Sequence, residues 1–292
     1  MNPAACRETW RGHQGAIYDA VWHEGSQSWL TAGGDGVVPA WKTGSADGRA
    51  LFHHEQAFFS VAAFGSDVLA GNASGEIMHL HEGQARRIEA HSGPVYTLSV
   101  GSSTDFWSGD GNGVVKRWIL GKQGVVQAQT WSTDLGKIRH IEPSPKGVLV
   151  ATGSGQVAII SPEGSLQIEA KAHEKSCYWA IWHPDKQGVV ISGGQQGQLA
   201  AHKDGESLLR VQAHQSAIYR ATIVDDELLT CSRDKSVKAW SLDTLECVGR
   251  MDLAHTRSIN AMAFDPSNAA QFVTGGDDRS LKLWNLAALT TQ

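Results

Sequence analysis

Short runs rich in apolar residues, separated by polar turns that contain glycine, extend along the whole chain. The first four are AIYDAVW at 16–22, SWLTAGG at 28–34, VVPAWK at 37–42 and RALFHHE at 49–55. Runs of this length, rich in Val, Ile, Trp and Tyr, are typical of antiparallel β-strands joined by tight turns. The pattern therefore predicts an all-β chain whose strands come in groups of four.

This group of four returns about every 41 residues, and a histidine marks each return. The marked positions are His13, His54, His91, His173, His214 and His255, and Asp134 fills the gap in the series. Later units follow at 58–91, 95–134, 138–173, 177–214 and 218–255, with a shorter unit at the end. A period of roughly 40–45 residues with four strands per repeat indicates a β-propeller. We therefore predict seven four-stranded antiparallel blades.

The last unit has only three strands of its own. After Trp284 only NLAALTTQ remains, whereas the strand-like segment CRETWR before His13 belongs to no unit. An open ring would expose two unpaired sheet edges, which folded proteins avoid. We therefore expect the N-terminal strand to join the last blade and close the ring, so that residues 1–292 form a single domain.

Three units carry a histidine, a hydroxyl, an aspartate and, six residues after the aspartate, a tryptophan. These sets are His13/Thr31/Asp35/Trp41, His214/Thr230/Asp234/Trp240 and His255/Thr274/Asp278/Trp284. With these landmarks in register, the chain resembles seven-bladed WD40-repeat β-propeller proteins over essentially its whole length. It departs from that family in having mostly Ala-His before the first strand, no Trp-Asp pair, and no tryptophan or acidic turn in the second and fourth units.

The resemblance implies that each set is a buried relay, from Trp to Thr, from Thr to His, and from His to Asp. A hydroxyl, a histidine and an aspartate also make up a nucleophilic triad. However, the set recurs three times, and its tryptophan can only donate a hydrogen bond. We therefore expect a structural network and no catalytic residue. The third unit has a weaker version, His91/Ser108/Asn112/Trp118, and the fifth has Gln196 and His202 at the Asp and Trp positions.

All four tyrosines of the chain stand five residues after the repeat position. Across the seven units this register reads Tyr18, Phe59, Tyr96, Arg139, Tyr178, Tyr219 and Asn260. The preceding residue is always apolar, so strand alternation turns the next side chain the other way, toward the channel mouth. The resemblance implies that this rim is a common docking surface, and Tyr and Arg are enriched at binding hot spots. We predict that these residues bind a partner, with a purely structural aromatic ring as the alternative.

Other features of the sequence exclude several classes of function. The net charge of −5 argues against a nucleic-acid-binding surface, and no apolar run is long enough to span a membrane. Four unpaired cysteines favour a reduced, cytoplasmic protein. His53, His54, His79 and His81 cluster in the sequence, but no Cys or carboxylate has matching ligand spacing beside them. We therefore expect no metal and no cofactor.

The function that these observations favour is a non-catalytic interaction scaffold that docks an apolar or mixed peptide on its top-face rim, and we expect a monomer. One alternative is a structural or self-associating subunit, in which the degenerate second and fourth units expose edges. Another is a small-molecule-binding or enzymatic propeller built around Asp134, Lys137 and Arg139. That set lacks a nucleophile paired with a base.

Overall fold

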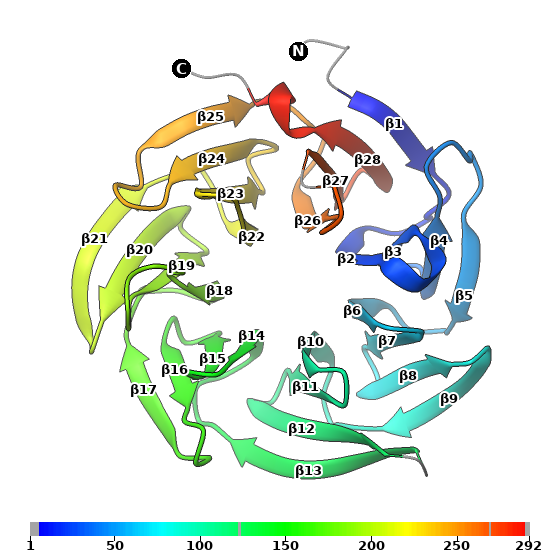
Figure 1. The fold of residues 1–292 in the computed structure, drawn as a ribbon, viewed down its shortest axis with the longest axis horizontal. Helices are drawn as coiled ribbons and strands as arrows, with labels where there is room; N and C mark the ends of the chain where they lie inside the picture. The colour runs from blue at the N-terminus through cyan, green and yellow to red at the C-terminus, as the bar shows by residue number, and fades with distance from the viewer. Residues whose placement is uncertain (1–5, 122–123, 269, 290–292) are drawn as a thin grey trace.

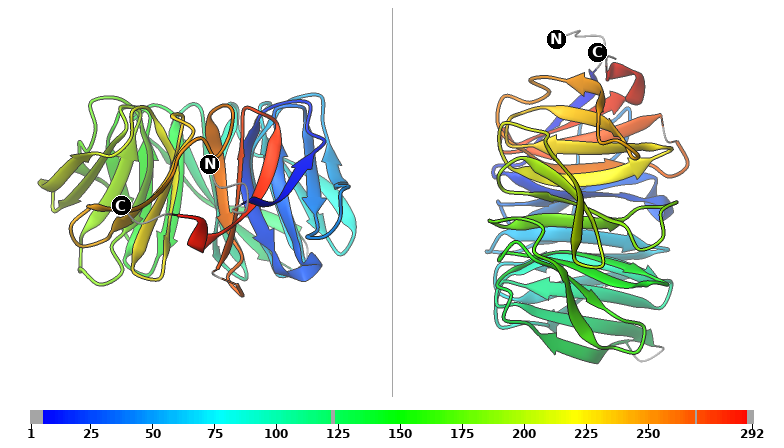
Figure 2. Two further views of the ribbon diagram at one scale, coloured as in Figure 1. Left: turned by 90° about the horizontal axis from the view of Figure 1, so that it is seen from above. Right: turned by 90° about the vertical axis from the view of Figure 1, so that its left-hand side faces the viewer.

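The computed structural model describes residues 6–121, 124–268 and 270–289. These residues form a ring of seven four-stranded antiparallel sheets around a central axis (Figure 1). Seen edge-on, the ring is a flattened disc whose strands run between its two faces (Figure 2). The predicted all-β, seven-bladed propeller is therefore confirmed.

The strands of each blade follow one another from the axis outward. The first blade consists of β2 (Ile17–His23), β3 (Ser28–Gly33), β4 (Val37–Trp41) and β5 (Arg49–His53). The second consists of β6 (Phe58–Phe64), β7 (Asp67–Asn72), β8 (Glu76–His81) and β9 (Gln84–Glu89). The third consists of β10 (Val95–Ser102), β11 (Asp105–Asp110), β12 (Val114–Gly121) and β13 (Gly124–Ser132). The fourth blade consists of β14 (Ile138–Ser144), β15 (Gly147–Thr152), β16 (Val157–Ile160) and β17 (Leu166–Ala170). The fifth consists of β18 (Cys177–Trp182), β19 (Val190–Gly194), β20 (Gln198–Lys203) and β21 (Glu206–Gln212). The sixth consists of β22 (Ile218–Val224), β23 (Glu227–Ser232), β24 (Val237–Ser241) and β25 (Cys247–Met251).

The seventh blade combines both ends of the chain. Its strands are β26 (Ile259–Phe264), β27 (Gln271–Gly276), β28 (Ser280–Asn285) and, outermost, β1 (Cys6–Arg11). Strand β1 runs antiparallel to β28, with Trp10 opposite Leu281. The Trp10 side chain is buried, and its indole Nε1 donates to the carbonyl of Ser45, 2.8 Å away in the first blade. The N-terminal segment thus closes the ring, as its sequence predicts.

The core lies between neighbouring blades rather than inside any one of them. Between the fifth and sixth blades, for example, Trp179 and Ile191 pack in one cluster with Leu228 and Trp240. The second strand of a blade is covered on both faces, and all six residues of β3 are buried. Burying a large apolar side chain contributes about 1.5–3 kcal/mol, so a blade is stable only with both neighbours in place.

The turn from β3 to β4 requires a glycine. Gly36 has a φ of +74°, and a Cβ at this position would lie 2.0 Å from the carbonyl oxygen of His54. That close approach allows the backbone N–H of His54 to donate to the carbonyl of Gly36 at 2.8 Å. The glycine turn thereby ties the first blade to the loop that carries the next repeat histidine.

Two short 3-10 turns, η1 (Glu24–Ser26) and η2 (Leu286–Ala288), complete the regular structure of the described residues.

Candidate functional site

The seven predicted rim residues occupy one structural position, the second residue of each innermost strand. In the first blade, Ile17 lies opposite Gly33 and Asp19 lies opposite Ala32, which leaves Tyr18 without a partner on β3. The same shift of register occurs at the equivalent residue of the other six inner strands. The rim residue is therefore the extra residue of a β-bulge in every blade.

The bulge turns the rim side chain away from the core. A β-bulge bends its strand and re-aims a side chain, which is a common arrangement next to functional sites. The residue before the rim remains fully buried in all seven blades: Ile17, Phe58, Val95, Ile138, Cys177, Ile218 and Ile259. The rim residues themselves are half-buried: Tyr18, Phe59, Tyr96, Arg139, Tyr178, Tyr219 and Asn260. Each blade thus contributes one packed residue and one accessible residue.

All seven rim residues line a single hollow of about 310 Å³, together with Arg220 and Asp277. One arc of the hollow is a row of aromatic rings. The centroids of Tyr18 and Phe59 lie 5.2 Å apart, and those of Phe59 and Tyr96 lie 5.1 Å apart. On the other side of Arg139, the rings of Tyr178 and Tyr219 meet edge to face at 5.1 Å. These separations are typical of favourable aromatic pairs.

Arg139 lies between the two aromatic groups. Its guanidinium carbon is 5.2 Å from the ring centroid of Tyr96 and 5.1 Å from that of Tyr178, and the ammonium of Lys137 lies 5.5 Å from the Tyr96 ring. Cation–π contacts of this kind contribute about 0.5–2 kcal/mol each. The Nε atom of Arg139 is buried and has no hydrogen-bond partner within the protein. The site therefore holds a cation packed between two aromatic rings.

The opposite side of the hollow carries hydrogen-bond acceptors. Asn260 donates from Nδ2 to Asp277 at 2.7 Å and to the carbonyl of Ile17 at 3.1 Å. Asp277 also lines the hollow. Burial, followed by the charge of Asp277, raises the pKa of Tyr18. Burial, followed by Tyr178, raises the pKa of Tyr219, so both hydroxyls stay neutral donors at physiological pH.

An ion pair lies beneath the aromatic residues. Arg220 Nη2 is 3.1 Å from the carboxylate of Asp19, which also accepts from the backbone N–H of Val61 at 3.1 Å. Arg220 lines both the rim hollow and a second hollow between the inner strands, where His140 also lies. Burial, followed by the charge of Arg220, lowers the pKa of His140 to about 3. Asp19 and Arg220 are 201 residues apart, so no local sequence signal marks this pair.

The three complete His/Thr/Asp/Trp sets form the hydrogen-bonded relays that the resemblance implies. In the first blade, Trp41 Nε1 donates to Thr31 Oγ1 at 2.9 Å, and that hydroxyl lies 2.8 Å from His13 Nε2. His13 Nδ1 in turn lies 2.9 Å from the carboxylate of Asp35. The sixth and seventh blades repeat the chain of bonds with Trp240, Thr230, His214 and Asp234, and with Trp284, Thr274, His255 and Asp278.

The incomplete relays of the third and fifth blades differ in detail from the sequence-based prediction. In the third blade His91 and Trp118 both bond Ser108, as expected, but the carboxylate beside His91 belongs to Asp110, at 3.3 Å. Asn112, which we predicted for that place, instead donates to Ser92. In the fifth blade only the His173–Ser192 bond remains, at 3.1 Å. Gln196 donates to Glu174, and His202 is buried with both ring nitrogens lacking a hydrogen bond.

A lysine two residues before the tryptophan is part of the same structural unit. Lys238 Nζ donates to the carbonyl of Ala213 at 2.7 Å and lies 5.6 Å from the Trp240 ring. Lys282 does the same with Ala254 and Trp284. These lysines thus hold the histidine loop to the third strand. The recurring Lys-x-Trp spacing is the signal that could have revealed their role.

The comparisons with known proteins agree with this geometry. A family model described as "WD domain, G-beta repeat" matches residues 4–42, 205–241 and 245–285. A crystal structure of the WD40 β-propeller domain of Doa1 superposes with a TM-score of 0.83, covering 97% of this chain and 96% of that one at 17% identity. The chain thus contains WD40 repeats, and its fold is a seven-bladed β-propeller. WD40 propellers generally act as protein-interaction scaffolds and not as catalysts.

Among curated proteins the similarity is local. Mitochondrial division protein 1 of Pyricularia oryzae is 32% identical over 88 residues, which are 28% of this WD40 chain and 12% of that protein. A WD repeat-containing protein 55 homolog of Drosophila ananassae is 28% identical over 110 residues, 36% of this chain and 22% of that protein. The matches thus span less than a quarter of either relative.

In the described part of the chain, no helix has the length and hydrophobicity to pass through a lipid bilayer.

Proposed function

We propose that this WD40 propeller is a non-catalytic scaffold that docks a peptide segment of a partner protein on its aromatic rim. The observation that supports this most strongly is the convergence of seven bulged residues, one from each blade, on a single hollow. A rigid ring holds these side chains in place before the partner arrives, which reduces the entropy lost on binding.

The chemistry of the hollow favours a mixed peptide with one apolar anchor. A volume of about 310 Å³ is at the small end for ligand pockets, which suits one or two side chains better than a cofactor. The tyrosine rings offer large contact areas with little rotamer freedom to lose. The positively charged Arg139 suits a backbone carbonyl or a carboxylate, and Asp277 offers an acceptor on the opposite side. An alternating apolar and polar segment therefore suits the rim.

The relay residues support a role outside catalysis. Thr31, Thr230 and Thr274 are fully buried, and each hydroxyl already bonds an indole and an imidazole. A nucleophile must reach its substrate, and these hydroxyls are enclosed by packed strands. In three blades the same hydrogen bonds link the second strand, the third strand and the histidine loop, which is a structural role.

The proposal is tested by selecting binders from a displayed library of random peptides. Peptides are selected on the wild-type chain and counter-selected on Tyr96→Ala/Tyr178→Ala/Tyr219→Ala, after the melting temperatures of both are compared. Families that share an apolar anchor and bind only the wild type are the expected result. Selected families that bind both proteins equally would mean that the rim is not the docking site.

A second candidate function is self-association through the outer strands. Val126 on β13, Ile168 on β17 and Leu208 on β21 expose 60%, 55% and 56% of their surface, and all three lie on outermost strands. Unpaired edge strands with apolar side chains favour edge-to-edge pairing. Light scattering over a range of concentrations distinguishes a monomer from a dimer, and Ile168→Lys would then dissociate the dimer.

A further inference from the structure

We propose that Asp67, His79 and His81 of the second blade bind a zinc-class divalent cation. This site is separate from the rim and does not depend on the proposed function. Strand β6 has the rim residue Phe59 at its second position and ends at the turn before Asp67, so the site lies toward the opposite face of the ring. The sequence-based expectation that no carboxylate accompanies these histidines overlooked Asp67.

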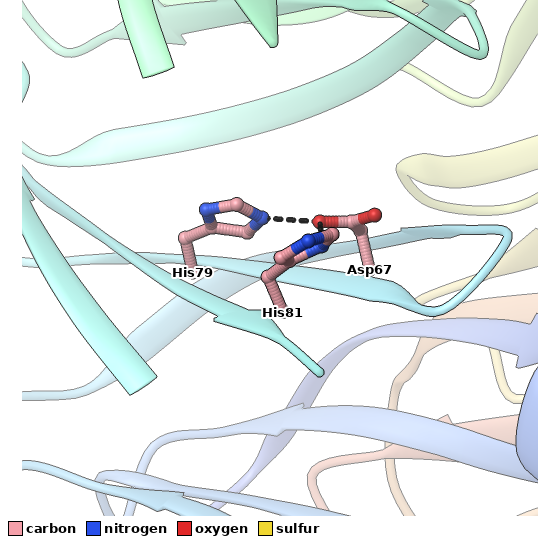
Figure 3. Close-up of side chains that lie close together, drawn as sticks. All are labelled: Asp67, His79 and His81. Carbon is pink, nitrogen blue, oxygen red and sulfur yellow. Dashed lines mark hydrogen bonds and ion pairs between the residues drawn. The ribbon is translucent and has the colours of Figure 1, made fainter. Parts of the chain in front are cut away.

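The strand pairing brings the three residues together. Strand β7 begins at Asp67 and the antiparallel strand β8 ends at His81, and Val68 of β7 lies opposite Leu80 of β8. Asp67 is therefore beside His81. His79 lies two residues before His81, so both imidazoles project from the same face of the strand. Figure 3 shows both rings pointing toward the Asp67 carboxylate.

The nitrogen and oxygen atoms of these three residues lie close enough together to bind one ion. His79 Nε2 lies 2.5 Å and His81 Nδ1 lies 2.9 Å from the same oxygen, Asp67 Oδ1. The three atoms all lie within 4.8 Å of one another. Zinc bonds nitrogen and oxygen at about 2.0–2.2 Å, so ligand atoms around a tetrahedral ion are separated by about 3.4 Å. Each contact to Asp67 must therefore open by less than about 1 Å to admit the ion.

Burial and charge indicate what kind of ion fits. The side chains of Asp67 and His79 are 12% and 6% exposed, whereas that of His81 is 51% exposed. The ion would enter from the His81 side and keep at least one position open for water or for a partner's side chain. Two imidazoles and one carboxylate are the ligands of zinc and similar transition metals, whereas Ca²⁺ and Mg²⁺ prefer sites made of oxygen.

The third blade provides an internal comparison. Asp105 begins β11 as Asp67 begins β7, and Arg117 follows it by twelve residues, the spacing that separates Asp67 from His79. There Arg117 Nε lies 2.9 Å from the Asp105 carboxylate, and Ile119 takes the place of His81. Arginine stays protonated and cannot ligate a metal, so that pair is structural. In the second blade a pair of imidazoles replaces the arginine, which converts an ion pair into a ligand set.

The comparison also suggests the variant that tests the proposal. His79→Arg recreates the Asp–Arg pair of the third blade, so the fold should be retained while the ligand set is lost. His81→Gln removes the exposed ligand and leaves the buried Asp67–His79 contact in place. His53→Gln is the matched control, because His53 is an exposed histidine on the neighbouring blade and lies outside the set.

The experiment is calorimetric titration of ZnCl₂ into the full chain after treatment with a chelator and dialysis. We expect one equivalent of zinc to bind to the wild type with a Kd of about 1 μM or tighter. His53→Gln should bind equally well, and both His79→Arg and His81→Gln should bind at least about 100-fold more weakly, since each loses a direct ligand. Zinc should also raise the melting temperature of the wild type and not that of His79→Arg.

Two results would overturn the proposal. One is a wild type that binds zinc no more tightly than His79→Arg and His81→Gln, because the zinc would then lie elsewhere. The other is a wild type without measurable binding in which His79→Ala alone lowers the melting temperature. That outcome would make the cluster a structural ion pair like Asp105–Arg117.

Discussion

The guanidinium of Arg139 lies 5.2 Å from the ring centroid of Tyr96, on the innermost strand of the neighbouring blade. The contact exists only because both residues are the extra residue of a β-bulge, which aims their side chains toward the channel mouth. It places the guanidinium over an aromatic ring while Nε remains without a partner within the protein. A cation packed between aromatic rings at the wall of the hollow is an arrangement to which a carbonyl or a carboxylate of a bound segment can add.

The closure of the ring depends on Trp10. We expect Trp10→Ala to lower the free energy of unfolding by about 3–5 kcal/mol, because the indole is buried between the seventh and first blades. Urea denaturation measures this directly. Thr9→Ala, on an exposed position of the same strand, should change stability by less than about 0.5 kcal/mol. Deletion of residues 1–11 should lower the melting temperature sharply, and an unchanged curve would contradict the closure.

The relays should stabilise the fold. We expect Asp234→Ala to cost on the order of 1–3 kcal/mol, because His214 and the backbone N–H of Gln215 lose their acceptor. Gln196→Ala changes the equivalent position of the eroded fifth blade and should cost much less. Equal melting temperatures for Asp234→Ala and the wild type would refute the relay.

The cost of Asp234→Ala should depend on pH. Burial alone would raise the pKa of Asp234, but the hydrogen bond and charge of His214, with the Ser236 hydroxyl, hold it well below its usual value. A carboxylate with a lowered folded-state pKa contributes stability above its unfolded pKa of about 3.9 and loses it as the pH falls. The difference between wild type and variant should therefore shrink below about pH 4. A constant difference down to pH 2.5 would contradict this assignment.

Glu142 should destabilise the fold at alkaline pH. Burial raises its pKa to about 7, against the opposing effects of the Trp182 backbone N–H and Lys146. A raised folded-state pKa favours folding below the unfolded value and loses that contribution as the pH rises toward the folded value. Glu142→Gln removes the charge, so relative to wild type it should gain on the order of 2 kcal/mol between pH 5 and pH 8. Urea titrations at both values test this, with exposed Glu55→Gln as the control.

Sequence alone predicted the ring because the repeat histidine returns at a regular spacing in six of the seven units, and it predicted the closure because the last unit lacks a fourth strand. It also identified the rim register, since an apolar residue precedes each rim position. The bulge was invisible, because it depends on which residues pair across strands. For the same reason Asp67, twelve residues from His79, was not associated with the histidines until β7 and β8 were paired. The carboxylate beside His91 belongs to Asp110, at the end of β11, and not to the position of Asn112 in the following turn, and the sequence does not show which of the two side chains turns inward.

Local sequence patterns could not predict contacts between residues that lie far apart in the chain. The Asp19–Arg220 pair links the first and sixth blades across 201 residues, and nothing near either residue predicts the other. Lysine usually lies on a solvated surface, whereas Lys238 is half-buried. Its hydrogen bond to the carbonyl of Ala213 arises only when the third strand packs beside the histidine loop.

The central claim is that the rim residues bind the partner, and affinity capture from a native lysate tests it most directly. The wild-type chain is compared with Tyr96→Ala/Tyr178→Ala/Tyr219→Ala, after both show the same melting temperature. We predict that a specific partner is retained by the wild type alone, because each lost hot spot costs about 2 kcal/mol or more. If both chains capture the same proteins in equal amounts, the tyrosines are structural and the account of the rim is wrong.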